Sequence, residues 1–206
     1  MNHKKRAVTI GISYLIIFFA AIFANFLVIE SLLSNPLETV SQQEIMVRAG
    51  VMAFLVTAVF DIVVAWGLDE IYKSHYLSKI STYFRIMHGT IMGVGVFALL
   101  TTLNLSNEVD ILSQVEVFNN IWLIGLFFFG VHLILLGKIF QGPRFIQVFL
   151  VVAGIMYMLD TTAHFMLPNY DEFSDLFLLL VAVPSIFGEL SLAIYFLVKR
   201  NVLKTS

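Results

Sequence analysis

The chain has 206 residues, of which 59% are hydrophobic and only 13% are charged, and its mean hydropathy is +0.91. This composition excludes a soluble globular domain and is typical of an integral membrane protein. The formal net charge is −2, and no basic stripe with interleaved aromatic residues occurs, so we expect no nucleic-acid partner. Because the chain contains no cysteine, disulfides, thiolate catalysis and cysteine-ligated metal are also excluded.

Apolar stretches long enough to cross a bilayer follow one another along the chain. Their approximate limits are residues 8–29, 45–68, 80–103, 119–140, 145–166 and 175–198. The first stretch exceeds the roughly 7–15 residues of a signal-peptide hydrophobic region, so we expect an uncleaved first helix. The pattern predicts an all-α protein, a six-helix transmembrane bundle in the lipid bilayer, with residues 1–206 in a single transmembrane domain.

The loops between these stretches are alternately basic and acidic. The basic loops carry Lys4, Lys5 and Arg6, then Lys73 and Lys79, then Lys138 and Arg144, and finally Lys199, Arg200 and Lys204. The acidic loops carry Glu30, Glu38 and Glu44, then Glu108, Asp110 and Glu116, and then Asp171, Glu172 and Asp175. Loops rich in Lys and Arg stay on the cytoplasmic side of a membrane, so both termini are predicted to be cytoplasmic.

Small residues and one proline suggest how the predicted helices pack. Gly89 and Gly93 are four residues apart and therefore share one face of the third predicted span. Close backbone approach drives helix association in lipid, so we expect a helix–helix contact through this face. Packing within the chain is the simpler expectation, and a dimer interface is the alternative. Pro184 lies midway along the sixth span and should kink it.

Some ionisable residues fall inside the predicted spans, where an ionised side chain costs about 2.5–3.5 kcal/mol at the bilayer centre. Five of them come from four spans and share a similar depth near the basic loops: Asp61, Arg85, His88, His132 and Glu189. We take these five as a candidate polar cluster in the cytoplasmic half. Asp160 and His164 are spaced by four residues nearer the acidic loops and form a secondary outer pair.

Three interpretations of the polar cluster remain open. In the first, Asp61 pairs with Arg85 and the other members hydrogen-bond across helices, so the cluster only stabilises the fold. In the second, His88 and His132 are candidate ligands of a metal ion, or bind a haem between helices. In the third, the cluster is a proton or substrate path. No spacing matches a known metal or nucleotide motif, so the cofactor stays unknown.

Three segments in the second half of the chain carry a family resemblance. They are Phe-Phe-Gly-Val-His-Leu-Ile-Leu-Leu-Gly at 128–137, Gly-Pro-Arg at 142–144 and Ala-Gly-Ile-Met-Tyr-Met-Leu-Asp at 153–160. Together they resemble the signature of domain-of-unknown-function family 4386, a bacterial family of small multi-span membrane proteins. Lys138 and the run Phe-Ile-Gln at 145–147 depart from the residues usual in that family.

The resemblance implies architecture and location rather than activity, because the activity of that family is not established. It implies a multi-pass protein of a bacterial-type cytoplasmic membrane. It also raises Asp61, Arg85 and His132 above the other candidates, since these match positions associated with the family.

The leading functional hypothesis is a multi-pass membrane protein whose buried polar cluster binds a small ligand or a proton. A first alternative is an intramembrane enzyme, metal-assisted or redox-active, in which His88, His132 and Glu189 act as ligands or acid–base groups. A second alternative is a non-catalytic partner that packs against another membrane protein through the face of Gly89 and Gly93.

Overall fold

A computed structural model describes residues 3–198, and every regular element in that range is helical. Six helical segments are long and apolar enough to cross a membrane: His3–Ser34, Glu44–Tyr72, Ser78–Thr102, Glu108–Ile139, Arg144–Met166 and Tyr170–Val198. The prediction of an all-α, six-helix membrane bundle is therefore confirmed. The predicted domain and its last basic loop extend to residue 206, and their residues 199–206 lie outside the described part of the chain.

Four of the six segments are single α-helices: α4 (Glu44–Tyr72), α5 (Ser78–Thr102), α6 (Glu108–Ile139) and α7 (Arg144–Met166). The first segment comprises α1 (His3–Phe23), the π-helical η1 (Ala24–Ile29) and α2 (Glu30–Ser34). A short helix, α3 (Pro36–Gln42), connects it to α4. The last segment comprises the 3-10 turn η2 (Tyr170–Phe173), α8 (Ser174–Ser185), the π-helical η3 (Ile186–Leu190) and α9 (Ser191–Val198).

Helix α6 begins well before the predicted span at 119–140. Asn107 caps its first turn, because its side-chain Oδ1 accepts a hydrogen bond of 2.9 Å from the backbone N–H of Asp110. Glu108 and Asp110 also favour a helix N-terminus electrostatically. The added turns carry acidic residues that do not belong in lipid, so a hydropathy criterion excludes them although they are helical.

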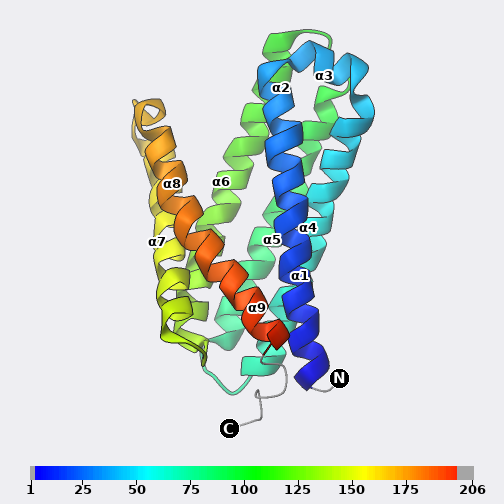
Figure 1. The fold of residues 1–206 in the computed structure, drawn as a ribbon. Helices are drawn as coiled ribbons and strands as arrows, with labels where there is room; N and C mark the ends of the chain where they lie inside the picture. The colour runs from blue at the N-terminus through cyan, green and yellow to red at the C-terminus, as the bar shows by residue number, and fades with distance from the viewer. Residues whose placement is uncertain (1–2, 199–206) are drawn as a thin grey trace.

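The helices form a bundle that is closed at one end and open at the other. Successive helices from α4 to α7 pack side by side, and α9 returns to pack against α1. Helix α8 instead packs on α7 and diverges from α1. The first and last segments are therefore apart at the end of the bundle opposite the start of α1 (Figure 1). Pro184 lies in the last turn of α8, directly before η3, where the last segment departs from regular α-helical bonding.

The predicted glycine face is only half engaged. An ideal Cβ on Gly89 would lie 3.2 Å from the carbonyl oxygen of Ala58, so this glycine packs against α4 within the chain. Gly93 has no atom within 4 Å of such a Cβ and faces open space. Two glycines approach each other where α6 meets α7, since a Cβ on Gly130 would lie 2.6 Å from the carbonyl oxygen of Gly154. Spacing marks a face of small residues, but the fold decides which face meets a neighbour.

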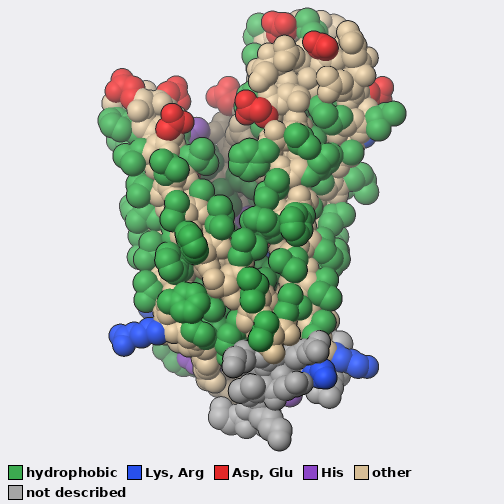
Figure 2. Space-filling model, in the orientation of Figure 1, with side chains coloured by type: hydrophobic (Ala, Val, Ile, Leu, Met, Phe, Trp, Pro, Cys, Tyr) green, Lys and Arg blue, Asp and Glu red, His purple; other side chains and the backbone are tan. Residues whose placement is uncertain are grey.

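Charge separates along the bundle axis. Acidic side chains gather at the open end, and most Lys and Arg side chains on the visible surface lie at the opposite end, where the described chain begins (Figure 2). Arg48, which pairs with Glu44 at the start of α4, is an exception at the acidic end. Between these ends the visible surface is mostly hydrophobic, as expected for contact with lipid (Figure 2). At the basic end, Arg6 Nη2 lies 2.7 Å from Glu70 Oε2 and links α1 to α4. This distribution agrees with the alternation of loop charges in the sequence.

Candidate functional site

A cavity of about 590 Å³ lies between the first and last segments, with α5 and α6 behind it. We call it the central cavity. Its volume is within the range of small-molecule sites in proteins. The cavity is lined on one side by α1 and η1 and on the other by α8 and η3. It is visible as a hollow between the first and last segments (Figure 2). Exposed Glu30 belongs to its lining, so the cavity reaches the surface at the acidic end.

A buried ion pair stands at the bottom of the central cavity. Nη2 of Arg85 on α5 lies 2.6 Å from Oδ1 of Asp61 on α4. Nη1 of Arg85 donates a hydrogen bond of 2.8 Å to the hydroxyl of Tyr14 on α1. The guanidinium carbon also lies over two rings, 4.7 Å from the centroid of Tyr14 and 5.1 Å from that of Phe129. Arg85 therefore has an opposite charge, a hydroxyl acceptor and two aromatic neighbours while being fully buried.

His132 of α6 joins this network through both ring nitrogens. Nη1 of Arg85 lies 3.2 Å from Nε2 of His132. An arginine has only donors, so Nε2 must accept and carries no proton. Nδ1 therefore holds the ring proton, and it lies 3.0 Å from the carbonyl oxygen and 2.9 Å from Oγ of Ser81. The neutral Nδ1–H form is the tautomer that satisfies these contacts.

His88 lies next to the ion pair and is only partly satisfied. Its Nε2 is 3.5 Å from Oδ2 of Asp61, and its ring packs on Phe129 with centroids 4.7 Å apart. Its Nδ1 is buried and has no hydrogen-bond partner among the residues that the structure describes. This nitrogen lies against Gly125, where an added Cβ would be 3.3 Å away.

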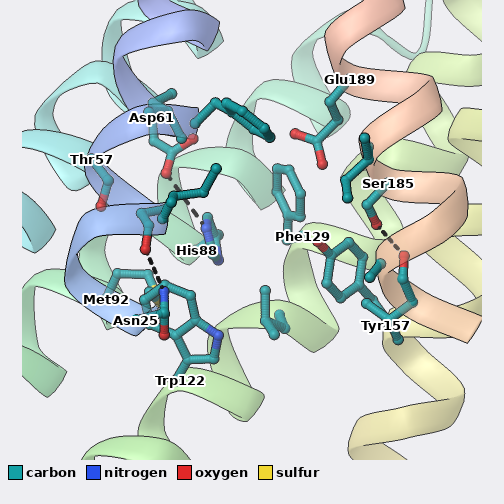
Figure 3. A pocket seen from close by; sticks show the side chains of 18 of the residues that line it. Asn25, Thr57, Asp61, His88, Met92, Trp122, Phe129, Tyr157, Ser185 and Glu189 are labelled. Carbon is teal, nitrogen blue, oxygen red and sulfur yellow. Dashed lines mark hydrogen bonds and ion pairs between the residues drawn. The ribbon is translucent and has the colours of Figure 1, made fainter. Parts of the chain in front are cut away.

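Glu189, the fifth candidate, stands apart from the other four. It comes from η3 on the opposite wall, and its carboxylate points into the central cavity, facing the side that carries Asp61 and His88 (Figure 3). Within residues 3–198 it has no hydrogen bond or ion pair. The structure therefore brings four of the predicted cluster residues into contact and places the fifth across the cavity from them.

The outer residues Asp160 and His164 do not form a mutual pair in the described structure. The hydroxyl of Tyr170 donates a hydrogen bond of 2.6 Å to Oδ1 of Asp160. Nε2 of His164 lies 3.2 Å from Oδ1 of Asn120 on α6. The two residues share one neighbour, since the His164 ring packs edge-on against Tyr170 at 4.8 Å. Asp160 also contributes to the wall of the central cavity.

The donor set does not resemble a metal site. Within residues 3–198, no three His, Cys, Asp or Glu side chains are placed to hold a metal ion together. His132 has both ring nitrogens in hydrogen bonds, so neither is free to ligate a metal or a haem iron. His88 has one nitrogen without a partner, but that nitrogen faces the backbone of α6. The arrangement can instead hold a polar group that reaches Glu189 from the cavity.

Three residues of the site are not ionisable at neutral pH and are absent from the sequence-based set. Tyr14 and Ser81 accept hydrogen bonds from Arg85 and His132. Phe129 lies between Arg85, His88 and Tyr157. Aromatic residues are abundant in this chain, with 20 Phe and 7 Tyr, so their type alone carries little information. For Ser81 the available signal was its position, because it is a hydroxyl residue inside a predicted span, two residues after Lys79.

A comparison with protein families gives a match over most of the chain. A family model described as Domain of unknown function (DUF4386) matches residues 9–199. Comparisons with curated proteins and with solved structures gave no match.

Proposed function

The chain belongs to the DUF4386 family, a domain of unknown function, and from that premise we propose that this multi-pass membrane protein binds an amphipathic small molecule in the central cavity. The polar part of that molecule lies beside Glu189 at the bottom of the cavity. Its apolar part extends between the first and last segments toward the acidic end. The protein acts in the cell membrane with its basic end in the cytoplasm, as the loop charges favour.

The position of Glu189 carries this proposal. A carboxylate that only stabilised the bundle should have a partner on a neighbouring helix, because an unpaired polar group in a membrane is costly. Asp61 has such partners in Arg85 and His88. Glu189 has no hydrogen bond or ion pair to a described residue, although it faces a cavity. A group supplied by a ligand is the simplest partner for it.

The shape of the central cavity supports an elongated ligand. Its lining runs along the first segment from Tyr14 to Glu30, a length of roughly 24 Å at the rise of an α-helix. Apolar side chains such as Phe18, Leu126 and Val181 make up most of the walls between the polar ends. The hollow between the first and last segments opens on the outer face of the bundle (Figure 2), so a ligand with an alkyl chain has access from the bilayer as well as from the acidic end.

The other two interpretations have less support. A metal-assisted enzyme would need several side chains that bind one metal ion together. His132 cannot be one of them, because both of its ring nitrogens are in hydrogen bonds, with Ser81 and with Arg85. A partner protein on the face of Gly89 and Gly93 would need both glycines exposed, and Gly89 is covered by α4.

Quenching of tryptophan fluorescence tests binding, because Trp122 lines the central cavity. The protein contains one other tryptophan, Trp66, so a Trp66→Phe background isolates the signal. In lipid nanodiscs, a twelve-carbon chain with a terminal bromine and a charged or neutral head group should quench Trp122 saturably. Ala182→Phe, which fills the cavity from α8, should abolish the saturable part.

Leu179→Phe is the matched control. Leu179 lies on the same helix, is 61% exposed and points to lipid rather than to the cavity. This variant should quench as the background does. Linear quenching that is equal in both variants would mean that the probe reaches Trp122 only through the lipid, and the proposal would be wrong.

A further inference from the structure

We infer that the ligand of the central cavity carries a positively charged nitrogen, an alkylammonium group that binds Glu189 beside the rings of Phe129 and Tyr157. This inference rests on the proposed function and specifies the class of ligand. It follows from three features of the cavity, namely its charge balance, the commitment of Arg85 and the aromatic residues near Glu189.

The first feature is the charge balance. The cavity lining contains one arginine, Arg85, and no lysine. Asp61 lies 2.6 Å from that arginine and neutralises it. The remaining acid at this depth is Glu189, which has no ion pair among the described residues. A cationic head group completes the balance, whereas an anionic head group would meet a second negative charge in a medium of low dielectric constant.

The second feature is that Arg85 is not available to an anion. Its Nη atoms are within hydrogen-bond distance of Asp61, Tyr14 and His132. The rings of Tyr14 and Phe129 cover it, and it is 0% exposed. Its remaining nitrogen, Nε, has no hydrogen-bond partner among the described residues but is buried, so a carboxylate or phosphate group would have to displace a neighbour of Arg85 to reach it. The cavity therefore presents an acceptor, Glu189, rather than a cationic donor.

The third feature is the aromatic wall next to Glu189. Phe129 and Tyr157 both line the central cavity, and their rings pack edge to face with centroids 5.6 Å apart. In the close view these two rings and Glu189 border the same space (Figure 3). Aromatic rings attract cations, and alkylammonium groups are frequent ligands of such walls. A neutral alcohol would gain neither this attraction nor an ion pair with Glu189.

Three matched probes distinguish the ligand classes in the Trp66→Phe background. They share a brominated twelve-carbon chain and differ in the head group, which is trimethylammonium, hydroxyl or carboxylate. We expect all three probes to quench Trp122 saturably. The ammonium probe should bind about tenfold or more tightly than the other two. In Glu189→Gln this preference should disappear while the hydroxyl probe still binds.

Glu38→Gln is the control for charge. It removes one acid from the acidic end, where Glu38 is exposed and lies outside the cavity lining, and should leave the ammonium preference in place. Retained binding of the hydroxyl probe shows that the Glu189→Gln variant is folded. If this variant does not fold, the order of the three probes in the unsubstituted background decides the question.

The outcomes separate the two proposals. Equal binding of the ammonium and hydroxyl probes, or an ammonium preference that survives Glu189→Gln, overturns the cationic ligand but leaves binding intact. If none of the three probes quenches Trp122 saturably, the proposed function is overturned as well. Nanodiscs with and without phosphatidylethanolamine then identify the source. If phosphatidylethanolamine weakens binding of the ammonium probe, the natural ligand is a lipid head group. If it does not, the natural ligand is a free amine. Both carry the inferred charge.

Discussion

Nη2 of Arg85 lies 2.6 Å from Oδ1 of Asp61, and neither residue is more than 3% exposed. The pair joins α4 to α5, and through Tyr14 and His132 it also reaches α1 and α6. A single guanidinium thus connects four helices at one depth of the bundle. Its planar fork suits this role, since it can bond in several directions at once.

Removing one partner of this pair should strongly destabilise the protein. Asp61→Ala leaves the Arg85 charge buried without its counter-ion, and the expected loss is about 3–5 kcal/mol in the free energy of unfolding. The double variant Asp61→Leu with Arg85→Met should lose less than the sum of the losses of Asp61→Leu and Arg85→Met made singly, because no charge is left unpaired. Denaturation in detergent, followed by circular dichroism, measures each value.

An exposed ion pair in the same chain provides the control. Arg48 and Glu44 are four residues apart on α4, and their side chains are more than half exposed. Glu44→Ala should therefore change the free energy of unfolding by at most about 1 kcal/mol. If Asp61→Ala were no more destabilising than Glu44→Ala, the buried pair would not hold the bundle together.

Two histidines should show opposite neutral tautomers. His132 accepts at Nε2 from Arg85 and holds its proton on Nδ1. His75, in the turn after α4, accepts at Nδ1 from the backbone N–H of Leu77, so its neutral form holds the proton on Nε2. Nitrogen-15 NMR of histidine-labelled protein at mildly alkaline pH distinguishes the two forms. An Nε2–H signal assigned to His132 through a His132→Gln variant would contradict the network.

Much of the fold follows from the sequence because lipid imposes a simple rule. Segments that cross a bilayer must be apolar and must satisfy their backbone hydrogen bonds internally, so hydropathy identifies the helices. The rule stops at the lipid boundary. It assigns no helix to the acidic start of α6, where Asn107 and Asp110 form a cap in a region that lipid does not select.

The candidate site is less accessible from the sequence. Asp61, Arg85, His88, His132 and Glu189 stand out because ionisable side chains are rare in membrane spans. Which of them meet depends on helix rotation, and hydropathy does not encode it. Glu189 lies across the central cavity from the other four because it comes from η3 of the last segment. Likewise, Tyr14 and Ser81 are ordinary residues by type and become significant only through contacts across the bundle.

The absence of cysteine allows a direct test of orientation. Ser106→Cys lies at the acidic end, between α5 and α6, and Lys79→Cys lies at the basic end, at the start of α5. Both positions are exposed. In intact cells, a membrane-impermeant maleimide should label Ser106→Cys and should label Lys79→Cys only after the membrane is permeabilised. Labelling in the reverse order would invert the proposed orientation.

The contact between α6 and α7 should tolerate no side chain at its glycines. In Gly130→Ala the new Cβ would lie 2.6 Å from the backbone oxygen of Gly154. In Gly154→Ala the corresponding Cβ would clash even more closely with the backbone oxygen of Gly130. Backbone cannot rotate away as a side chain can, so the helices must separate, at a cost of about 1–3 kcal/mol in the free energy of unfolding. Thermal unfolding in detergent should show lower midpoints for both variants.

Gly93→Ala gives the opposite expectation and so separates packing from helix propensity. No atom lies within 4 Å of an added Cβ at Gly93, and alanine favours a helix interior over glycine by roughly 0.5–1 kcal/mol. This variant should match or exceed the thermal midpoint of the unsubstituted protein. A midpoint reduced as much as in Gly130→Ala would mean that Gly93 contacts another chain in the membrane. This result would support the hypothesis that another membrane protein packs against the face of Gly89 and Gly93, because the described chain itself offers Gly93 no neighbour.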